Sequence, residues 1–474
     1  MKYSYIAFHL FNICIRMSII VLTIMTSFFI FLILTLTQSE NDRLYGVESG
    51  SHLPTISDRN LKVQLIYEGK FEFEPNQISP VSSFTFFGND ILVLSKNKGT
   101  VNRIVNGTML EEPLLDVNVA NKRERGMLGI TTSAPIDSNV IPFFLYYTET
   151  KKMDGTDICP KTYYCIPGSD KVENRLYRYE YVDNKLINPK LLLRLPAEPA
   201  PSHNGGAIGI GPDNNIYITI GDLVGSVNKT SSTRAQNFKT GTNPDGRAGI
   251  LQITQDGKPA SAGSLLGKEF PLNLYFAYGI RNSFGIDFDP ITGNLWDTEN
   301  GPQYGDEINM VEPGFNSGWI TIQGEWKPTA SSDPNRDLVA GNKVLNYSSL
   351  TTFEGKGKYS PPEFTWRNTV GPTSLKFLDS NKLGKKYEND IFVGSVNLGT
   401  IFHFDLNSAR KDLNLKGELE DKVADNHNEL KDIIFGEGFS KITDIEVGPD
   451  GYLYILSYKG QSYNIYRVVP KDLN

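Results

Sequence analysis

Short runs in which apolar and polar residues alternate dominate the chain from about Leu61 onward. The runs are rich in β-branched and aromatic residues, and Gly, Asn, Asp and Pro stand between them. Strict alternation over a few residues is typical of β-strands, and no long stretch has the 3.6-residue period of a helix. The pattern therefore predicts an all-β domain over residues 61–474, preceded by a linker at residues 41–60.

Several of these runs share one design, in which a Gly-Pro-Asp or Asp-Pro-x-x-Gly turn precedes the strand. The design occurs at residues 211–220, 289–296 and 448–456. Recurrence at this spacing predicts a β-propeller, whose radial four-stranded sheets leave only short edges. A β-sandwich is the alternative, but it would use fewer strands than this length supplies. The polar segments 151–170 and 407–437 are predicted surface excursions.

The N-terminal forty residues differ from the rest of the chain. Residues 17–37 are almost wholly apolar, with Lys2 and Arg16 before them and acidic residues after them. About twenty apolar residues can cross a bilayer as a helix, and preceding basic residues favour an N-terminus inside. No small-x-small cleavage site follows, which favours an uncleaved membrane anchor at residues 1–40 over a removed signal peptide. In both cases the globular part is exported: membrane-anchored in the first, secreted in the second.

Composition narrows the class of partner. The formal net charge is -7, the pI is near 5.5, and no long Lys/Arg run occurs, which argues against nucleic acid. In an oxidising compartment Cys159 and Cys165 should form a local disulfide. The sequons at Asn106, Asn228 and Asn346 can carry glycans in an exported protein.

One of only five histidines lies in an open, glycine-rich segment. It is His203, in the run Ser202-His-Asn-Gly-Gly206 ahead of a predicted strand. An imidazole can take and release a proton near neutrality, and the flanking glycines would let a flat ligand approach it. The alternative interpretation is that His203 only caps a turn.

A second block, from Gly279 to Asn309, follows downstream. It reads Gly-Ile-Arg-Asn, then Phe-Asp-Pro, Leu-Trp, Glu-Asn-Gly-Pro and Gly-Asp-Glu-Ile-Asn. Together with the His203 block it resembles the pyrroloquinoline quinone (PQQ)-dependent glucose and sorbosone dehydrogenase family. The resemblance covers about residues 61–468 and implies a six-bladed propeller that holds PQQ and Ca²⁺ in its mouth and oxidises an aldose sugar at C1 to the lactone.

The resemblance also implies roles for individual residues. Asp222 corresponds to the family's Thr-Ile-Gly-Asp motif, where a carboxylate would fix the tautomer of the histidine. Arg281 and Asn282 match the pair that contacts the quinone oxygens, where a guanidinium would stabilise developing negative charge. Taken in isolation, this pair is equally typical of a surface arginine and a turn asparagine.

Three further positions match the family. Gly301 and Pro302 occupy the Gly-Pro position, where backbone carbonyls are implied to hold Ca²⁺, an ion that accepts such ligands readily. Asp306 and Glu307 can support that site or pin its loop. Glu124 falls where a Gln or Glu contacts the cofactor.

The C-terminal third departs from the family. Its glucose-oxidising branch has a lysine where this chain has Asn397, and an Arg-x-Arg where this chain has Lys441-Ile-Thr443. PQQ is a tricarboxylate, so each lost cation removes about 1.5 to 3 kcal/mol, although Lys441 can keep one such contact as a cofactor ligand. Ser202 replaces an acidic residue, which predicts altered sugar recognition. Trp366 with Thr369 can line a sugar pocket, although a tryptophan buried in a strand is the commoner explanation.

Sugar oxidation by hydride transfer needs a cofactor, because no side chain accepts a hydride. No G-x-G-x-x-G segment leads from a strand into a helix, so a nicotinamide site is unsupported. On the resemblance carried by the two matched blocks, we predict an exported PQQ- and Ca²⁺-dependent aldose sugar dehydrogenase with His203 as general base. A non-enzymatic binding propeller and a Ca²⁺-dependent lactonase-type hydrolase are the alternatives. The sugar and the electron acceptor stay open.

Overall fold

The computed structural model describes residues 53–71, 78–135, 140–150, 172–223, 233–260, 265–328 and 347–473. These residues form β-strands and short 3-10 helices. Within these ranges, no helix is both long and apolar enough to cross a bilayer. The predicted anchor at residues 1–40, the pair Cys159 and Cys165, and the sequons at Asn228 and Asn346 lie outside the described residues.

Within the unit Leu53–Asn474, the strands of the described residues form six sheets. The first contains β3 (Val81–Phe87), β4 (Asp90–Ser95), β5 (Thr100–Val105), β6 (Thr108–Met109) and β7 (Leu115–Asp116). The second contains β8 (Met127–Thr132), β9 (Ile141–Glu149), β10 (Glu173–Val182) and β11 (Lys185–Pro196). The third contains β12 (Ile208–Ile210), β13 (Ile216–Ile220), β14 (Gly249–Ile253), β15 (Tyr275–Tyr278), β19 (Phe315–Asn316) and β20 (Lys358–Tyr359).

The remaining three sheets follow in chain order. The fourth contains β16 (Ser283–Phe288), β17 (Leu295–Glu299), β18 (Asp306–Val311), β21 (Phe364–Trp366) and β25 (Val423–Ala424). The fifth contains β22 (Pro372–Phe377), β23 (Ile391–Ser395), β24 (Ile401–Phe404), β26 (Ile434–Glu437) and β1 (Thr55–Ile56). The sixth contains β27 (Lys441–Val447), β28 (Leu453–Lys459), β29 (Ser462–Pro470) and β2 (Leu61–Lys70). The 3-10 helices span Arg234–Gln236, Leu272–Leu274, Tyr347–Ser349, Lys385–Tyr387, Gly417–Asp421 and Glu429–Asp432.

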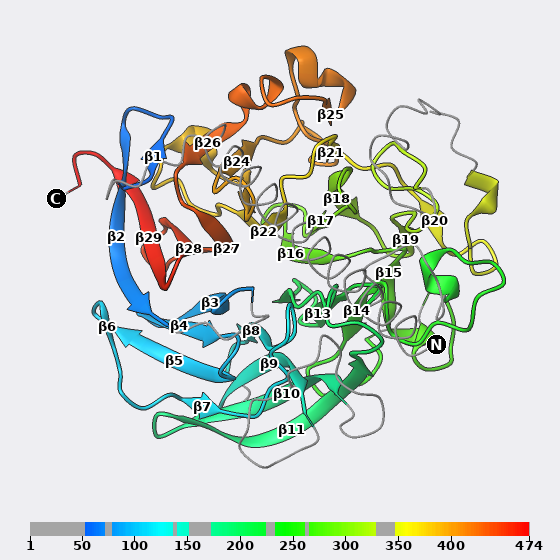
Figure 1. Cartoon of the computed structure of the whole chain (residues 1–474), viewed down its shortest axis with the longest axis horizontal. Coiled ribbons are helices and arrows are strands. Elements are labelled where there is room, and N and C mark those ends of the chain that lie inside the picture. Colours follow the sequence, from blue (N-terminus) through cyan, green and yellow to red (C-terminus); the bar gives the residue numbers. More distant parts are fainter. Residues whose placement is uncertain are drawn as a thin grey trace, which may run out of the picture. The chain divides into compact units, whose positions relative to one another are not determined.

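The first strands of these sheets meet in a closed ring. β3 contacts β8, β8 contacts β12, β12 contacts β16, β16 contacts β22, β22 contacts β27, and β27 returns to β3. Figure 1 shows β3, β8, β16, β22 and β27 near the centre and β6, β11, β20 and β25 toward the periphery. This radial arrangement confirms the predicted all-β propeller.

The start of the domain closes the ring. β2 pairs antiparallel with β29, with Leu61 opposite Pro470, so the sixth sheet combines the first long strand with the last three. Pairing of this kind covers an edge strand that would otherwise be open to other chains. Apolar side chains from adjacent sheets fill the space between them, as where Tyr146 and Leu176 pack with Ile218 and Leu251.

Two predicted boundaries need correction. The segment 407–437 is not only a surface excursion, because β26 pairs with β24 and the side chains of Leu419 and Leu430 are buried. The segment has so many charged residues that its few apolar, inward-packing positions do not form a recognisable sequence pattern. The predicted linker is too long, because β1 already pairs with β26. A two-residue strand is too short to leave an alternating pattern.

Candidate functional site

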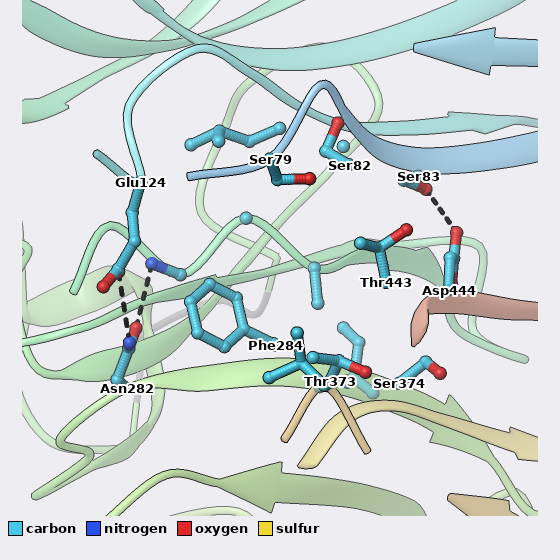
Figure 2. A pocket seen from close by; sticks show the side chains of 18 of the residues that line it. Ser79, Ser82, Ser83, Glu124, Asn282, Phe284, Thr373, Ser374, Thr443 and Asp444 are labelled. Carbon is cyan, nitrogen blue, oxygen red and sulfur yellow. Dashed lines mark hydrogen bonds between the residues drawn. The ribbon is translucent and has the colours of Figure 1, made fainter. Parts of the chain in front are cut away.

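A cavity of about 340 Å³ lies among the first strands of the six sheets. Ligand sites of this size are common in proteins. Figure 2 shows Glu124 and Asn282 at one end of the cavity and Ser83, Thr443 and Asp444 at the other. Of the predicted site residues, the lining includes Glu124, His203, Arg281, Asn282 and Gly301. Asp222, Pro302 and Lys441 are not among the lining residues.

His203 and Asp222 form a buried pair. Nδ1 of His203 lies 2.5 Å from Oδ1 of Asp222, and the two residues are 6% and 1% exposed. The second carboxylate oxygen accepts a hydrogen bond of 2.8 Å from Nε1 of Trp319. A carboxylate beside Nδ1 favours the tautomer with its proton on that nitrogen, which makes Nε2 the proton acceptor.

The backbone around His203 adopts a conformation that few residues tolerate. The φ angle of His203 is 61°, in the left-handed region, and that of Gly205 is 63°. A Cβ atom at Gly205 would lie 2.5 Å from the carbonyl oxygen of Thr219, so only glycine fits. Left-handed non-glycine residues are concentrated at functional sites, where the surrounding structure holds them in place.

Glu124 joins three segments that are distant in sequence. Its Oε2 accepts a hydrogen bond of 2.5 Å from the backbone N–H of His203 and one of 3.2 Å from Nδ2 of Asn282. Oδ1 of Asn282 in turn accepts from the backbone N–H of Gly205 at 3.2 Å (Figure 2). These bonds hold the loops before β8, β12 and β16 together at one end of the cavity.

Arg281 presents an unpaired donor. Its backbone N–H donates to Glu299. In the side chain, one terminal nitrogen donates to the carbonyl of Asn300 at 2.7 Å, and the guanidinium carbon lies 5.3 Å from the ring centroid of Trp319. Nε is buried and has no hydrogen-bond partner among the described residues. Burial lowers the pKa of Arg281, while Asp222 and other acids oppose the shift, and a guanidinium stays protonated in either case. Arg281 also lines the cavity, so its guanidinium is a candidate contact for a ligand.

Asp306 pins the Gly301 loop. Its Oδ1 accepts a hydrogen bond of 2.8 Å from the N–H of Gly301. Oδ2 accepts from the hydroxyl of Thr369 and from the N–H groups of Val370 and Gly371, at 2.7, 2.7 and 2.8 Å. Of the two roles considered for Asp306, the structure supports the loop-pinning one.

We expect the substitution Asp306→Asn to destabilise the protein by about 1 to 3 kcal/mol, because an amide cannot accept at both ends and leaves buried N–H groups unpaired. The free energy of unfolding from urea denaturation measures this loss. Asp472→Asn, which changes an exposed aspartate, is the matched control. Equal stability of the two variants would contradict the pinning role.

The metal prediction rests on carbonyl groups. No group of three or more His, Cys, Asp or Glu side chains in the described ranges can hold a metal ion. A carbonyl site at Gly301 and Pro302 is of a different kind, and Gly301 alone of the two lines the cavity. Glu307 accepts hydrogen bonds from Gln323 and Gly324, so it pins a neighbouring loop.

The predicted cofactor cation Lys441 does not reach the cavity lining. Its side chain is exposed, and Nζ lies 5.8 Å from the ring centroid of Tyr458. Lys441 is the first residue of β27, and the register of that strand shifts between Ile442 and Asp444, which a sequence pattern does not reveal. Thr443 lines the cavity in its place.

Three residues with a part in the site were missed. Trp319 contacts both Asp222 and Arg281. Lys96 and Lys376 also line the cavity. Lys96 directly follows the apolar strand β4, and this placement could have indicated it, whereas Lys376 lies inside β22 and leaves no such signal.

Trp366 does not line the cavity. It is 1% exposed and packs against Phe402 and Phe404 in the core, and Thr369 bonds to Asp306. The predicted sugar-pocket role of these two residues is therefore wrong for Trp366, since a large apolar strand residue is buried most favourably between sheets.

Comparisons with known proteins agree with the fold. Residues 79–467 match the family model described as glucose/sorbosone dehydrogenase. The aldose sugar dehydrogenase YliI of Escherichia coli is 24% identical over 283 residues, which cover 59% of this chain and 63% of the relative. Quinoprotein glucose dehydrogenase B of Acinetobacter calcoaceticus is 29% identical over 210 residues, 42% of this chain and 43% of the relative. The chain thus matches less than two thirds of the length of either relative.

Solved structures share the fold. The apo-form of the soluble aldose sugar dehydrogenase from Escherichia coli has a TM-score of 0.60 and 19% identity, covering 87% of this chain and 100% of that one. The PQQ-bound aldose sugar dehydrogenase from Streptomyces coelicolor has a TM-score of 0.55 and 18% identity, covering 88% and 100%. With the match to the family model over most of its length, this chain belongs to the glucose/sorbosone dehydrogenase family.

Proposed function

We propose that this protein is an exported, six-bladed quinoprotein that oxidises an aldose sugar at C1 to the lactone, with PQQ and Ca²⁺ as cofactors. The six sheets of the described residues support this blade number, each sheet being taken as one blade. The observation that carries the proposal is the buried His203–Asp222 pair at a cavity whose wall also holds the unpaired Nε of Arg281. The sugar is the small-molecule partner, and the electron acceptor is external.

The residues around the cavity fit PQQ. Arg281 and Asn282 provide donors for quinone oxygens at the end that carries His203. The rest of the lining carries neutral hydroxyl groups, from Ser79, Ser82, Ser83, Thr373, Ser374 and Thr443. The hydroxyl of Ser374 has no hydrogen-bond partner among the described residues, while the others donate to oxygens of the protein and would have to rotate toward a carboxylate. When bound, PQQ would supply the electron-accepting carbonyl that receives the C1 hydride.

The protein's own groups handle the proton. As the C1–H bond breaks, Nε2 of His203 accepts the proton of the sugar hydroxyl, and the oxygen's electron pair forms the carbonyl of the lactone. Asp222 stabilises the resulting imidazolium through Nδ1. Arg281 places positive charge in a buried wall, where such charge acts more strongly than in water.

The Gly301 loop would hold the metal ion. Its carbonyl group and that of Pro302 are oxygen ligands of the kind that Ca²⁺ prefers. Asp306 keeps the loop in one position through its bonds to Gly301 and to residues 369–371. A site preorganised in this way loses less entropy when the ion binds.

The neutral hydroxyls should weaken cofactor affinity relative to family members with cations at these positions. Charge-assisted hydrogen bonds are roughly twice as strong as neutral ones. Lys376 lines the same wall, but its ammonium lies 3.0 Å from Glu446 and 3.5 Å from Asp287. Its charge is therefore largely compensated within the protein.

A titration of the purified protein with PQQ in the presence of Ca²⁺ tests the proposal. We expect saturable absorbance changes and a stabilisation of about 2.7 kcal/mol at a hundredfold excess over the dissociation constant. A calcium chelator should reverse both, and dye-linked oxidation of aldoses should appear only with both cofactors. A protein that shows neither binding nor stabilisation would instead be a non-enzymatic binding propeller.

The proposal includes the cellular location. Residues 1–40 would anchor the protein in the membrane with the propeller on the outer side, or be removed and leave it secreted. Export would also permit the Cys159–Cys165 disulfide. Among the sequons, Asn106 is exposed at the turn between β5 and β6.

A further inference from the structure

Lys96 is a buried lysine at the edge of the cavity. It follows β4 directly, and it is 4% exposed. Its backbone is held on both sides, since its N–H donates to the carbonyl of Pro80 and its carbonyl accepts from the N–H of Met127, each at 2.9 Å. The side chain therefore extends from a rigid point between the first and second sheets.

The ammonium group of Lys96 binds the loop that carries Glu124. Nζ donates to the carbonyl of Arg123 at 2.8 Å and to the carbonyl of Arg125 at 2.9 Å. These two carbonyls flank Glu124 in the chain. The lysine thus holds the backbone on both sides of the one carboxylate that accepts from both His203 and Asn282.

We propose that Lys96 is a positioning residue that holds Glu124 against the His203 backbone and Asn282 and so keeps the quinone end of the cavity in its binding arrangement. The consequence for cofactor binding rests on the function proposed above. The clamp, by which we mean the bonds from Lys96 to the carbonyls of Arg123 and Arg125 around Glu124, does not rest on that function, because all of its bonds lie within the protein.

Burying the charged ammonium of Lys96 lowers the stability of the folded protein. This cost favours a functional explanation for a lysine at this position. Burial lowers the pKa of Lys96 from 10.5 to about 7, and the nearby charge of Glu124 only partly opposes the shift. Between those two values the unfolded chain holds a proton that the folded protein lacks. The charged lysine therefore lowers the free energy of unfolding by its full amount below pH 7, and this loss of stability disappears as the pH rises toward 10.5. A methionine would fill the same space without this cost.

The same titration gives the clamp a pH dependence. A neutral amine still has two N–H donors, but its hydrogen bonds to carbonyls are weaker than those of an ammonium. Other ionisable groups also line the cavity, namely His203, Arg281, Lys376, Asp444 and Glu446. The readout must therefore be local to Glu124, and the backbone N–H of His203 provides it, since this N–H donates to the carboxylate.

Hydrogen exchange in the cofactor-free protein tests the clamp. At about pH 6, below the pKa of Lys96, the peptide containing the His203 amide should exchange at least about tenfold faster in Lys96→Met than in wild type. Lys98→Met, which removes an exposed lysine two residues away, should exchange like wild type. In a Glu124→Ala background the Lys96 substitution should have no further effect. Unchanged exchange in Lys96→Met, or full additivity with Glu124→Ala, would overturn the proposal.

A measurement without mutation guards against a variant that does not fold. The protection factor of the His203 amide in wild type, corrected for intrinsic exchange, should fall several-fold between about pH 6 and about pH 9. A constant protection factor would also overturn the proposal.

Cofactor titration separates this proposal from the proposed function. With Ca²⁺ present, Lys96→Met should weaken PQQ binding about tenfold or more, while Lys98→Met leaves it unchanged. A wild-type protein that fails to bind PQQ would contradict the proposed function, and the exchange experiment would still decide the role of Lys96. Faster exchange together with unchanged PQQ affinity would overturn the link between the clamp and the binding site.

Discussion

His203→Ala should lower the turnover number for sugar oxidation by about 10² to 10⁴, the usual contribution of a general base, in protein reconstituted with PQQ and Ca²⁺. The reason is local: the imidazole is held by Asp222 through Nδ1, and its other ring nitrogen is the group available to take the hydroxyl proton. Steady-state kinetics with an artificial electron acceptor measure the loss.

The fold and the cofactor site should survive this change. His203 joins the rest of the site through its backbone N–H, which donates to Glu124 and is kept in the alanine variant, and through Nδ1, whose bond to Asp222 is lost. The melting temperature should therefore fall, because one oxygen of a buried carboxylate loses its partner, but Asp222 keeps its bond from Trp319 and the variant should still fold. His427→Ala, at an exposed histidine, should retain full turnover and serves as the matched control. Unchanged turnover in His203→Ala would remove the proposed mechanism, while loss of both turnover and folding would call for His203→Gln.

The second large effect is expected at Arg281. Arg281→Met keeps most of the side-chain volume but removes the positive charge and the unpaired Nε donor. Loss of one preorganised donor to developing negative charge lowers turnover by about 10² to 10³. We also expect weaker PQQ binding, because the quinone end of the cavity loses the cation that lies over Trp319.

The charge and the geometry of Arg281 can be separated. Arg281→Lys keeps the charge but loses the planar fork, so its turnover should lie between that of wild type and that of Arg281→Met. Arg59→Met removes an exposed arginine and should behave as wild type. If Arg281→Met bound and oxidised as well as wild type, the arginine side chain would have only a structural part, through its bond to the carbonyl of Asn300 and its contact with Trp319.

The alternation of side chains along the chain was sufficient to predict the fold class. Residues of period two must have one face in the core, and closely spaced turns leave no room for long helices. The sequence pattern does not reveal which strands distant in the chain pair with each other. β1 joins β26 across most of the chain, and β2 joins β29, because backbone hydrogen bonds between strands depend on how the ring closes and not on local pattern.

Some features of the candidate site could be predicted from the sequence, and others could not. The glycine-rich context of His203 and the Arg281–Asn282 pair are visible as motifs, because a left-handed backbone and a close approach restrict the residue types. Only the tertiary structure decided that Glu124 meets the His203 backbone, that Trp319 supports Asp222, and that Lys96 flanks the cavity while Lys441 does not. Contacts of that kind depend on the direction of each side chain in three dimensions, which is set when sheets distant in sequence pack around one axis.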